Sequence, residues 1–200
     1  MKRFKMPAEG IIISKGMETN LSTKDGQILR MIYIYNDFGG THTTVMAAAY
    51  HLKKLPVTRA PTKDEILTTH NFNKLNYSDR GKLFFHGTDD EGNRVYTMGR
   101  GKSKILVPGV VNLLSMLIEE NKLQEKIILS NTSPTVPLPM TLGGLLSRWL
   151  KIDVIGVPLL IMGAKKAYRD IINVVDHTKT AAKDSTSQLI VLDNKRIAGG

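Results

Sequence analysis

The sequence contains no cysteine. This absence excludes disulfide bonds, thiolate zinc sites and a cysteine nucleophile. The sequence also lacks any run of about 18 consecutive apolar residues, which is the length that a membrane-spanning helix needs. The two longest apolar stretches, residues 105–118 and 154–164, are interrupted or too short. The sequence therefore predicts a cytoplasmic protein with no membrane partner.

Several functional motifs are missing as well. The five histidines include no HxxxH pair, and no serine lies in a G-x-S-x-G motif, so neither a strong metal motif nor a triad hydrolase is indicated. The formal net charge is +10, but no basic stretch is interleaved with aromatic residues as in many nucleic-acid-binding proteins. We therefore expect no metal site and no nucleic-acid partner.

The most informative stretch is residues 31–56, MIYIYNDFGGTHTTVMAAAYHLKKLP. It begins as an apolar strand, continues through a Gly-Gly turn and enters a helix at the threonines. The free backbone N–H groups and the dipole of a helix N-terminus both favour a negatively charged ligand. The sequence thus predicts a phosphate-binding loop whose candidate ligand residues are Gly39, Gly40, Thr41, His42, Thr43 and Thr44.

This loop departs from a complete Walker motif, G-x-x-x-x-G-K-[ST]. Thr41 replaces the last glycine of the related G-G-x-G-K-T-T form, and His42 replaces the lysine. That lysine is a permanent cation, whereas a histidine is only partly charged at neutral pH. The next buried strand, residues 126–131, ends in Ser-Asn and supplies no acidic residue for Mg²⁺. We therefore predict a degenerate loop that binds a phosphate-containing small ligand or nucleotide. The alternative is a tight turn capped by threonines.

The order of predicted elements indicates the fold class. Strand–helix units alternate along the chain, and a β-hairpin over residues 82–88 and 94–98 interrupts them. This pattern predicts an α/β fold: a three-layer α/β/α sandwich, P-loop/Rossmann-like, with a mainly parallel sheet and a β-hairpin addition. Residues 152–157 are expected to form its last strand, followed by a helix. We expect one domain over residues 31–178, a disordered N-terminal extension over residues 1–30 and a flexible C-terminal tail over residues 179–200.

A second group of residues suggests acid–base chemistry. His42 and His86 each follow an apolar strand, so parallel neighbouring strands would bring both imidazoles close to Asp89. Such a group fits a phosphate-ester hydrolase, while the alternative is that both histidines only satisfy turns. Arg100 and Arg148 are the fixed cations expected beside a bound anion, because a guanidinium bonds phosphate bidentately. A third interpretation is a non-enzymatic scaffold that binds a protein partner.

Three motifs together carry a family resemblance. They are Y-x-x-x-G-G-x-H-[ST]-[ST] from Tyr35, H-G-T-D-x-x-G-N-x-V-Y-x-x-G-R-G from His86 and L-G-G-x-L-S-R from Leu142. Over residues 31–175 the chain resembles a small family of proteins of unknown function from endospore-forming bacteria. The resemblance implies a cytoplasmic bacterial protein linked to sporulation. It implies no particular activity or cofactor.

Overall fold

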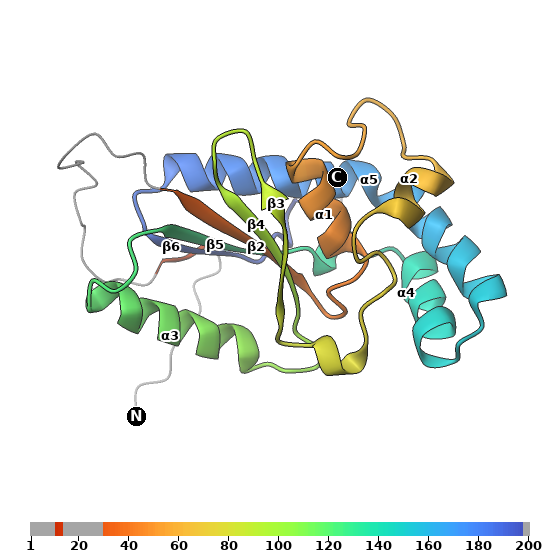
Figure 1. The fold of residues 1–200 in the computed structure, drawn as a ribbon, viewed down its shortest axis with the longest axis horizontal. Coiled ribbons are helices and arrows are strands. Elements are labelled where there is room, and N and C mark those ends of the chain that lie inside the picture. The colour runs from red at the N-terminus through yellow and green to blue at the C-terminus, as the bar shows by residue number, and fades with distance from the viewer. Residues whose placement is uncertain (1–10, 14–29, 198–200) are drawn as a thin grey trace.

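The computed structural model describes residues 11–13 and 30–197 (Figure 1). A six-stranded sheet has the order β1-β6-β5-β2-β4-β3. The strands are β1 (Ile11–Ile13), β2 (Met31–Asp37), β3 (Leu83–Thr88), β4 (Arg94–Gly99), β5 (Lys126–Asn131) and β6 (Leu189–Leu192). The α-helices are α1 (Thr43–His51), α2 (Lys63–Thr68), α3 (Leu106–Glu119), α4 (Leu138–Gly144) and α5 (Asp153–Asp184). Short helical turns are η1 (Tyr77–Asp79), η2 (Ser133–Thr135) and the π-helix η3 (Leu145–Trp149).

Strand β2 lies in the middle of the sheet. It pairs in parallel with β4 and β5, and β5 pairs in parallel with β6, whereas β3 and β1 are antiparallel additions at the two edges. The prediction of an α/β protein with a mainly parallel sheet is therefore confirmed. The predicted hairpin is also confirmed as β3 and β4. A central parallel strand is covered on both faces, which explains why β2 is apolar along most of its length.

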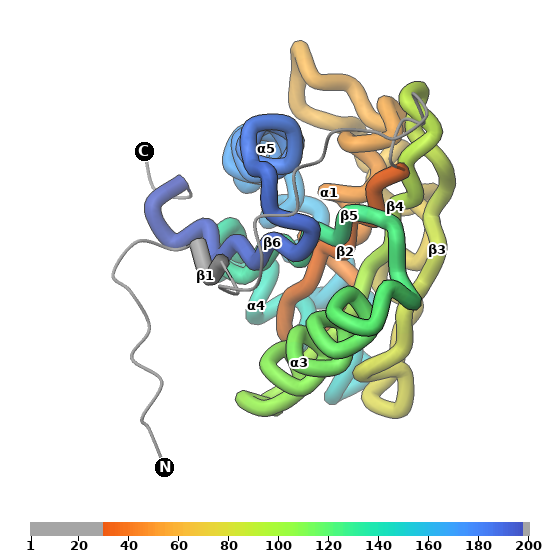
Figure 2. The backbone as a smooth tube through the Cα atoms, turned by 90° about the vertical axis from the view of Figure 1, so that its left-hand side faces the viewer, coloured from red at the N-terminus to blue at the C-terminus, as the bar shows by residue number. Residues whose placement is uncertain are grey.

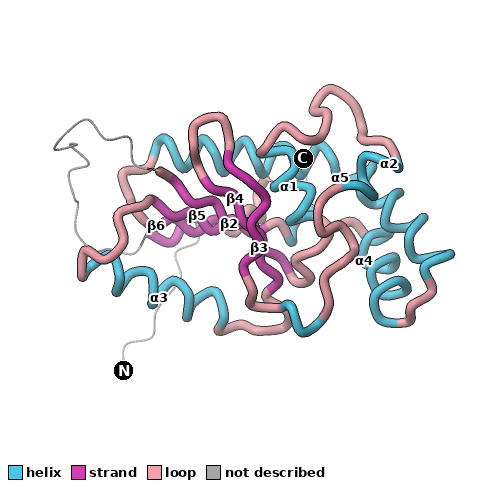
Figure 3. Tube along the Cα trace, viewed as in Figure 1, coloured by secondary structure: helices cyan, strands magenta, loops and turns pink. Residues whose placement is uncertain are grey.

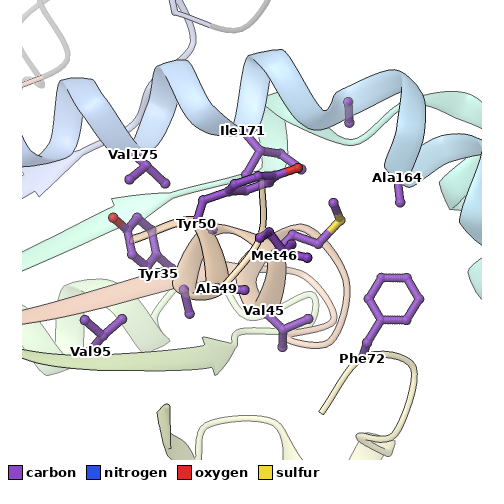
Figure 4. Packing of buried hydrophobic residues seen from close by; sticks show 14 of the residues in the cluster. Tyr35, Val45, Met46, Ala49, Tyr50, Phe72, Val95, Ala164, Ile171 and Val175 are labelled. Carbon is purple, nitrogen blue, oxygen red and sulfur yellow. The ribbon is translucent and has the colours of Figure 1, made fainter. Parts of the chain in front are cut away.

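Helices cover both faces of the sheet (Figure 2). Helices α1 and α5 lie on one face and α3 lies on the other. Because side chains alternate along a strand, Tyr33 and Tyr35 enter the core under α1 and α5, while Ile34 joins the core under α3. Figure 4 shows the first of these cores, in which Tyr35 lies among side chains of α1 and α5 such as Tyr50 and Val175.

Helix α1 is buried along its whole length. Its small residues Ala47, Ala48 and Ala49 leave room for α5 to pack close to the sheet. The helix ends at His51, and two residues later Lys53 adopts a positive φ of 55°, which is incompatible with a continued α-helix. The start of α2 follows a local sequence rule, since Thr62 and Glu65 have the spacing of a capping box and form one.

The predicted strand over residues 152–157 is wrong. These residues form the connection into α5 and its first turns (Figure 3). Their β-branched side chains favour a strand locally, but packing of α4 and η3 on α5 overrides that preference. A Cβ on Gly156 would lie 2.6 Å from the backbone nitrogen of Ser147, so glycine allows the close approach. Pro158, which suggests a break in the sequence, lies inside α5.

The predicted C-terminal tail also belongs in part to the fold. Residues 179–184 continue α5, and residues 189–192 form β6, with Leu189, Ile190 and Leu192 buried. The strand is only four residues long and its flanks are polar, so its signal in the sequence is weak. Of the predicted N-terminal extension, Ile11–Ile13 pairs with β6, while residues 1–10 and 14–29 lie outside the described residues.

Truncation of a β6 side chain tests this correction. Leu192 is 1% exposed, so Leu192→Ala is expected to lower the free energy of unfolding by about 2–5 kcal/mol through lost burial and a cavity. The matched control is Leu138→Ala, whose side chain is 80% exposed and whose loss should cost less than about 0.5 kcal/mol. Urea denaturation followed by circular dichroism measures both. Equal midpoints for the two variants would contradict the placement of β6 in the core.

Candidate functional site at the β2–α1 loop

The loop between β2 and α1 crosses directly over the end of β4. Gly40 has a φ of +72°, and a Cβ there would lie 2.5 Å from the backbone nitrogen of Gly99. In return, a Cβ on Gly99 would lie 2.7 Å from the carbonyl oxygen of Gly39. Two backbones therefore meet where no side chain fits. This contact explains Gly40 and Gly99 without a ligand, as the tight-turn interpretation requires.

The carboxylate of Asp37 lies inside the loop. It accepts a hydrogen bond from the backbone N–H of Gly40 at 2.5 Å and another from the hydroxyl of Thr43 at 2.8 Å. The Thr43 hydroxyl also lies 3.1 Å from that of Thr132, beyond the end of β5. In a Walker loop the corresponding donors surround a phosphate. Here they bind a buried carboxylate of the chain itself.

The first turn of α1 has unused hydrogen-bonding capacity. Its N-cap residue, His42, makes no side-chain cap, and the first turn contains no acidic residue. The hydroxyl of Thr44 is buried and has no hydrogen-bond partner. A buried hydroxyl without a partner costs free energy, about 1–3 kcal/mol. Such a group at a helix N-terminus is the feature of this loop that most clearly suggests a ligand.

Arg100 lies at the same edge of the sheet. Its backbone N–H donates to the carbonyl of Asp37 at 2.8 Å, which holds the residue beside the β2–α1 loop. Its Nη2 donates to the Ser133 hydroxyl at 2.9 Å and lies 3.4 Å from Asn131 Oδ1, while its Nε is buried without a partner. Among the residues that the structure describes, Arg100 forms no ion pair with a carboxylate. Its charge therefore remains available to an anion.

Arg148, the second predicted cation, has a different role. Its guanidinium donates to three consecutive carbonyls and to one amide oxygen, at 2.5–3.2 Å: those of Asn73, Lys74 and Leu75, and Asn76 Oδ1. These bonds fasten η3 to the loop that precedes η1. Because its two Nη atoms make all four of these bonds, Arg148 is a structural residue in this arrangement, although its Nε, like that of Arg100, is buried without a partner.

His42 does not supply the cation that the loop lacks. Its Nε2 lies 3.2 Å from Asn73 Oδ1, and Asn73 in turn donates to the Ser147 hydroxyl at 2.8 Å. Burial lowers the pKa of His42 below its ordinary value, although Asn73 and the charge of Asp37 oppose this shift. The neutral imidazole therefore donates from Nε2 to Asn73 and links α1 to η3 rather than neutralising a phosphate.

The three candidate catalytic residues do not meet. Because β3 is antiparallel to β4, His86 lies away from the carboxyl edge and lines a cleft of about 240 Å³ together with His70 and Leu52. Leu52 follows the C-terminal end of α1, whereas His42 precedes its N-terminus. A helix of nine residues is about 13 Å long, so the two imidazoles lie at opposite ends of α1. The His86 ring instead hydrogen-bonds Thr97 Oγ1 at 2.9 Å.

Asp89 belongs to a buried network that the sequence does not reveal. His51 lies 2.8 Å from the Tyr35 hydroxyl through Nδ1 and 3.0 Å from Asp89 Oδ2 through Nε2. Burial lowers the pKa of His51 to about 4, so the ring is neutral. Burial alone would raise the pKa of Asp89, but hydrogen bonds from His51 and Asn93 hold it below its ordinary value. Hence Tyr35 donates to His51, and His51 donates to the Asp89 carboxylate.

This network connects β2, α1 and the β3–β4 turn. Its members are separated by 16 and 38 positions in the sequence, so no local spacing marks them. The only sequence signal is the polar His51 at the end of an otherwise alanine-rich, buried helix. All three side chains are nearly inaccessible to solvent, which fits a structural role.

The molecule is thus an α/β protein with a glycine turn and an uncapped helix start at the carboxyl edge of a mainly parallel sheet. A family described as "Protein of unknown function (DUF3189)" matches residues 32–180, and the chain belongs to this family. No curated protein and no solved structure matches the chain.

Two features are absent from the described ranges of the chain. No helix within residues 11–13 and 30–197 is long and apolar enough to cross a membrane. The same part of the chain contains no cluster of three or more histidine or acidic side chains able to hold a metal ion.

Adjacent threonines provide a matched test of the loop geometry. Thr43→Val removes hydrogen bonds to Asp37 and Thr132, so we expect a loss of about 1.5–3 kcal/mol in the free energy of unfolding. Thr44→Val removes only an unpartnered hydroxyl, so its effect should be neutral or stabilising by about 1 kcal/mol. Chemical denaturation of both variants measures the difference. A larger loss for Thr44→Val would contradict the assignment of the two hydroxyls.

The buried histidines predict a loss of stability in mild acid. The pKa of His51 is about 4 in the folded protein and about 6.5 in the unfolded chain, and His86 has the same two pKa values. As the pH falls from about 6.5 towards 4, the unfolded chain binds more protons, so each histidine lowers stability by at most about 1.4 kcal/mol per pH unit. Above a pH of about 6.5, the neutral buried histidines contribute their full share to the free energy of unfolding. Urea melts at several pH values should show a shallower slope in His51→Gln, and an unchanged slope would contradict the shift.

Proposed function

We propose that this protein binds a small phosphate-containing ligand, a phosphate ester or a nucleotide, between the β2–α1 loop and Arg100. The observation that carries the proposal is the buried, unpartnered hydroxyl of Thr44 at the uncapped start of α1. An oxyanion there accepts a hydrogen bond from Thr44 and from first-turn N–H groups. Such a ligand removes the free-energy cost of burying the Thr44 hydroxyl without a hydrogen-bond partner.

Arg100 supplies the positive charge in this site. Phosphate and arginine form charge-assisted hydrogen bonds, and the buried Nε of Arg100 has no partner within the chain. Ser133 holds the guanidinium from the β5 side, so the side chain is positioned before a ligand arrives. The proposal therefore replaces the predicted pair of Arg100 and Arg148 by Arg100 alone.

Asp37 makes this site different from a Walker loop. Its carboxylate accepts hydrogen bonds from the N–H of Gly40 and the hydroxyl of Thr43, the two donors that a bound phosphate also requires. When a phosphate binds, these two groups stop donating to Asp37 and donate to the ligand. Repulsion between the carboxylate and the phosphate opposes the exchange, so removal of the Asp37 charge should strengthen binding.

The wider setting of the proposal follows from the fold and the family resemblance. Phosphate loops of P-loop and Rossmann-like three-layer proteins occupy the same position after a parallel strand, which supports a degenerate relative of them here. The cytoplasmic and sporulation-linked setting implied by the resemblance is part of the proposal. The separation of His42 from His86 favours binding over phosphate-ester hydrolysis.

Thermal-shift measurements on the full chain test the binding site. With inorganic phosphate, pyrophosphate, AMP and ATP as probes, at least one should raise the melting temperature in a saturable way. A probe at 100 times its Kd adds about 2.7 kcal/mol of stability. Arg100→Gln and Thr44→Val should lose the shift, and Asp37→Asn should reach it at a lower probe concentration.

Arg169→Gln is the matched control, because Arg169 is exposed on α5 and contacts Tyr168. It should respond to the probe as the unmodified chain does. Equal loss in Arg169→Gln and Arg100→Gln would indicate nonspecific charge binding and overturn the site. The absence of a shift with every probe would favour the scaffold interpretation instead.

A further inference from the structure

The connection between η3 and α5 is unusually apolar and exposed. All seven residues from 149 to 155 are exposed, and five of them are large and apolar: Trp149, Leu150, Ile152, Val154 and Ile155. Trp149 is 80% exposed and Val154 is 88% exposed. Segments exposed at a protein surface are normally polar, so this exposed apolar segment indicates a site of interaction with a partner.

The exposed surface continues along α4 and η3. Leu138, Leu142, Leu145 and Trp149 follow one another at intervals of four, three and four residues, which places them on one helical face. The opposite face packs against α5 through buried residues that include Met140, Gly143 and Ser147. We call the exposed residues of these two paragraphs the α4–α5 tip.

The α4–α5 tip lies at one end of the molecule. In Figure 1, α4 and the start of α5 extend beyond the strands, at the right-hand end of the view. Glycine contacts hold the two helices close together, so the tip is a firm projection rather than a loose loop. A shallow hollow near the tip is lined by Pro158 and Met162.

Basic side chains lie within the tip and further along α5. Lys151 belongs to the tip, and Lys165 and Lys166 are exposed about three turns beyond it. The one acidic residue of the tip, Asp153, accepts a hydrogen bond from the buried Ser147 hydroxyl. The apolar projection belongs to a chain whose formal net charge is +10.

We propose that the α4–α5 tip inserts into the interface of a lipid bilayer that contains anionic lipids. Exposed tryptophan and aliphatic side chains partition into the headgroup–acyl boundary, and neighbouring lysines bind anionic headgroups. A bilayer needs no shape complementarity, which suits a projection of exposed apolar side chains. Attachment at the surface requires no spanning helix, so this proposal is compatible with the lack of one in the described residues, but it differs from the sequence-based expectation of no membrane partner.

A second copy of the chain is the competing occupant. Two copies would bring two chains of +10 together, which disfavours association at low salt. A phosphatidylglycerol-containing bilayer has the opposite charge. Charge complementarity therefore favours the membrane, and this inference is independent of the proposed phosphate site.

The protein carries its own probe for this proposal, because Trp149 is the only tryptophan. With vesicles of phosphatidylcholine and phosphatidylglycerol, the fluorescence of the full chain should shift to shorter wavelength. Lipids brominated in their acyl chains should quench it, and the protein should sediment with the vesicles. Vesicles of phosphatidylcholine alone should give much weaker binding, and added salt should weaken binding to the anionic vesicles.

Matched variants separate insertion from nonspecific attraction. Val154→Asp places a charge in the tip and should abolish the fluorescence shift, whereas Val57→Asp changes a residue that is 57% exposed elsewhere and should not. Both add one negative charge, so only position differs. The double change Lys165→Glu and Lys166→Glu should lower the partition coefficient at least about 25-fold. Circular dichroism melts confirm that each variant is folded.

Two outcomes would overturn the proposal. One is unchanged tryptophan fluorescence with anionic vesicles, or equal binding by Val154→Asp and Val57→Asp. The other is a shift to shorter wavelength that depends on protein concentration without lipid, together with a dimer mass by light scattering. That second outcome would assign the α4–α5 tip to a second copy of the chain.

Discussion

The contact between the backbones of Gly40 and Gly99 is the constraint on which the candidate site depends. It holds the β2–α1 loop against the end of β4, and the glycines leave no room for a side chain at the crossing. The turn at Gly40 directs its N–H to Asp37, and the next residues lead into α1. The residue after Gly99 is Arg100, so the same crossing places a cation beside the loop. One backbone contact thus positions the carboxylate, the helix start and the guanidinium together.

The proposed site combines groups suited to anion binding with the Asp37 carboxylate, which would compete with an anion for the same donors. Thr44 and Arg100 retain polar atoms without partners, which is unusual for buried groups in a folded protein. Asp37, however, already satisfies Gly40 and Thr43. In a Walker loop the corresponding donors bind the phosphates of a nucleotide, and a lysine adds positive charge. In this member of the DUF3189 family, the loop is stabilised by its own acid, so the ligand that we propose would compete with Asp37.

Two regions of the molecule therefore hold side chains that lack a suitable partner within the chain. At the carboxyl edge of the sheet these groups are polar and buried, which suits a small ligand. At the α4–α5 tip they are apolar and exposed, which suits a surface rather than a pocket. Helix α5 connects the regions, because its first turns form the tip and its later turns cover the core over β2. Binding of the α4–α5 tip to a bilayer would not involve the β2–α1 loop at the carboxyl edge of the sheet.

The sequence by itself determined the features that depend on neighbouring residues. The apolar β2 strand, the glycine turn, the Thr62–Glu65 capping box and the β3–β4 hairpin follow local rules and agree with the structure. Only the tertiary structure decided the partners of the functional side chains. It pairs Arg148 with three backbone carbonyls and one side-chain amide oxygen 72 to 75 positions away, separates His42 from His86 by the length of α1, and turns residues 153–157 into helix through contact with η3. These outcomes depend on burial and on hydrogen bonds between distant segments, and neither is visible in local spacing.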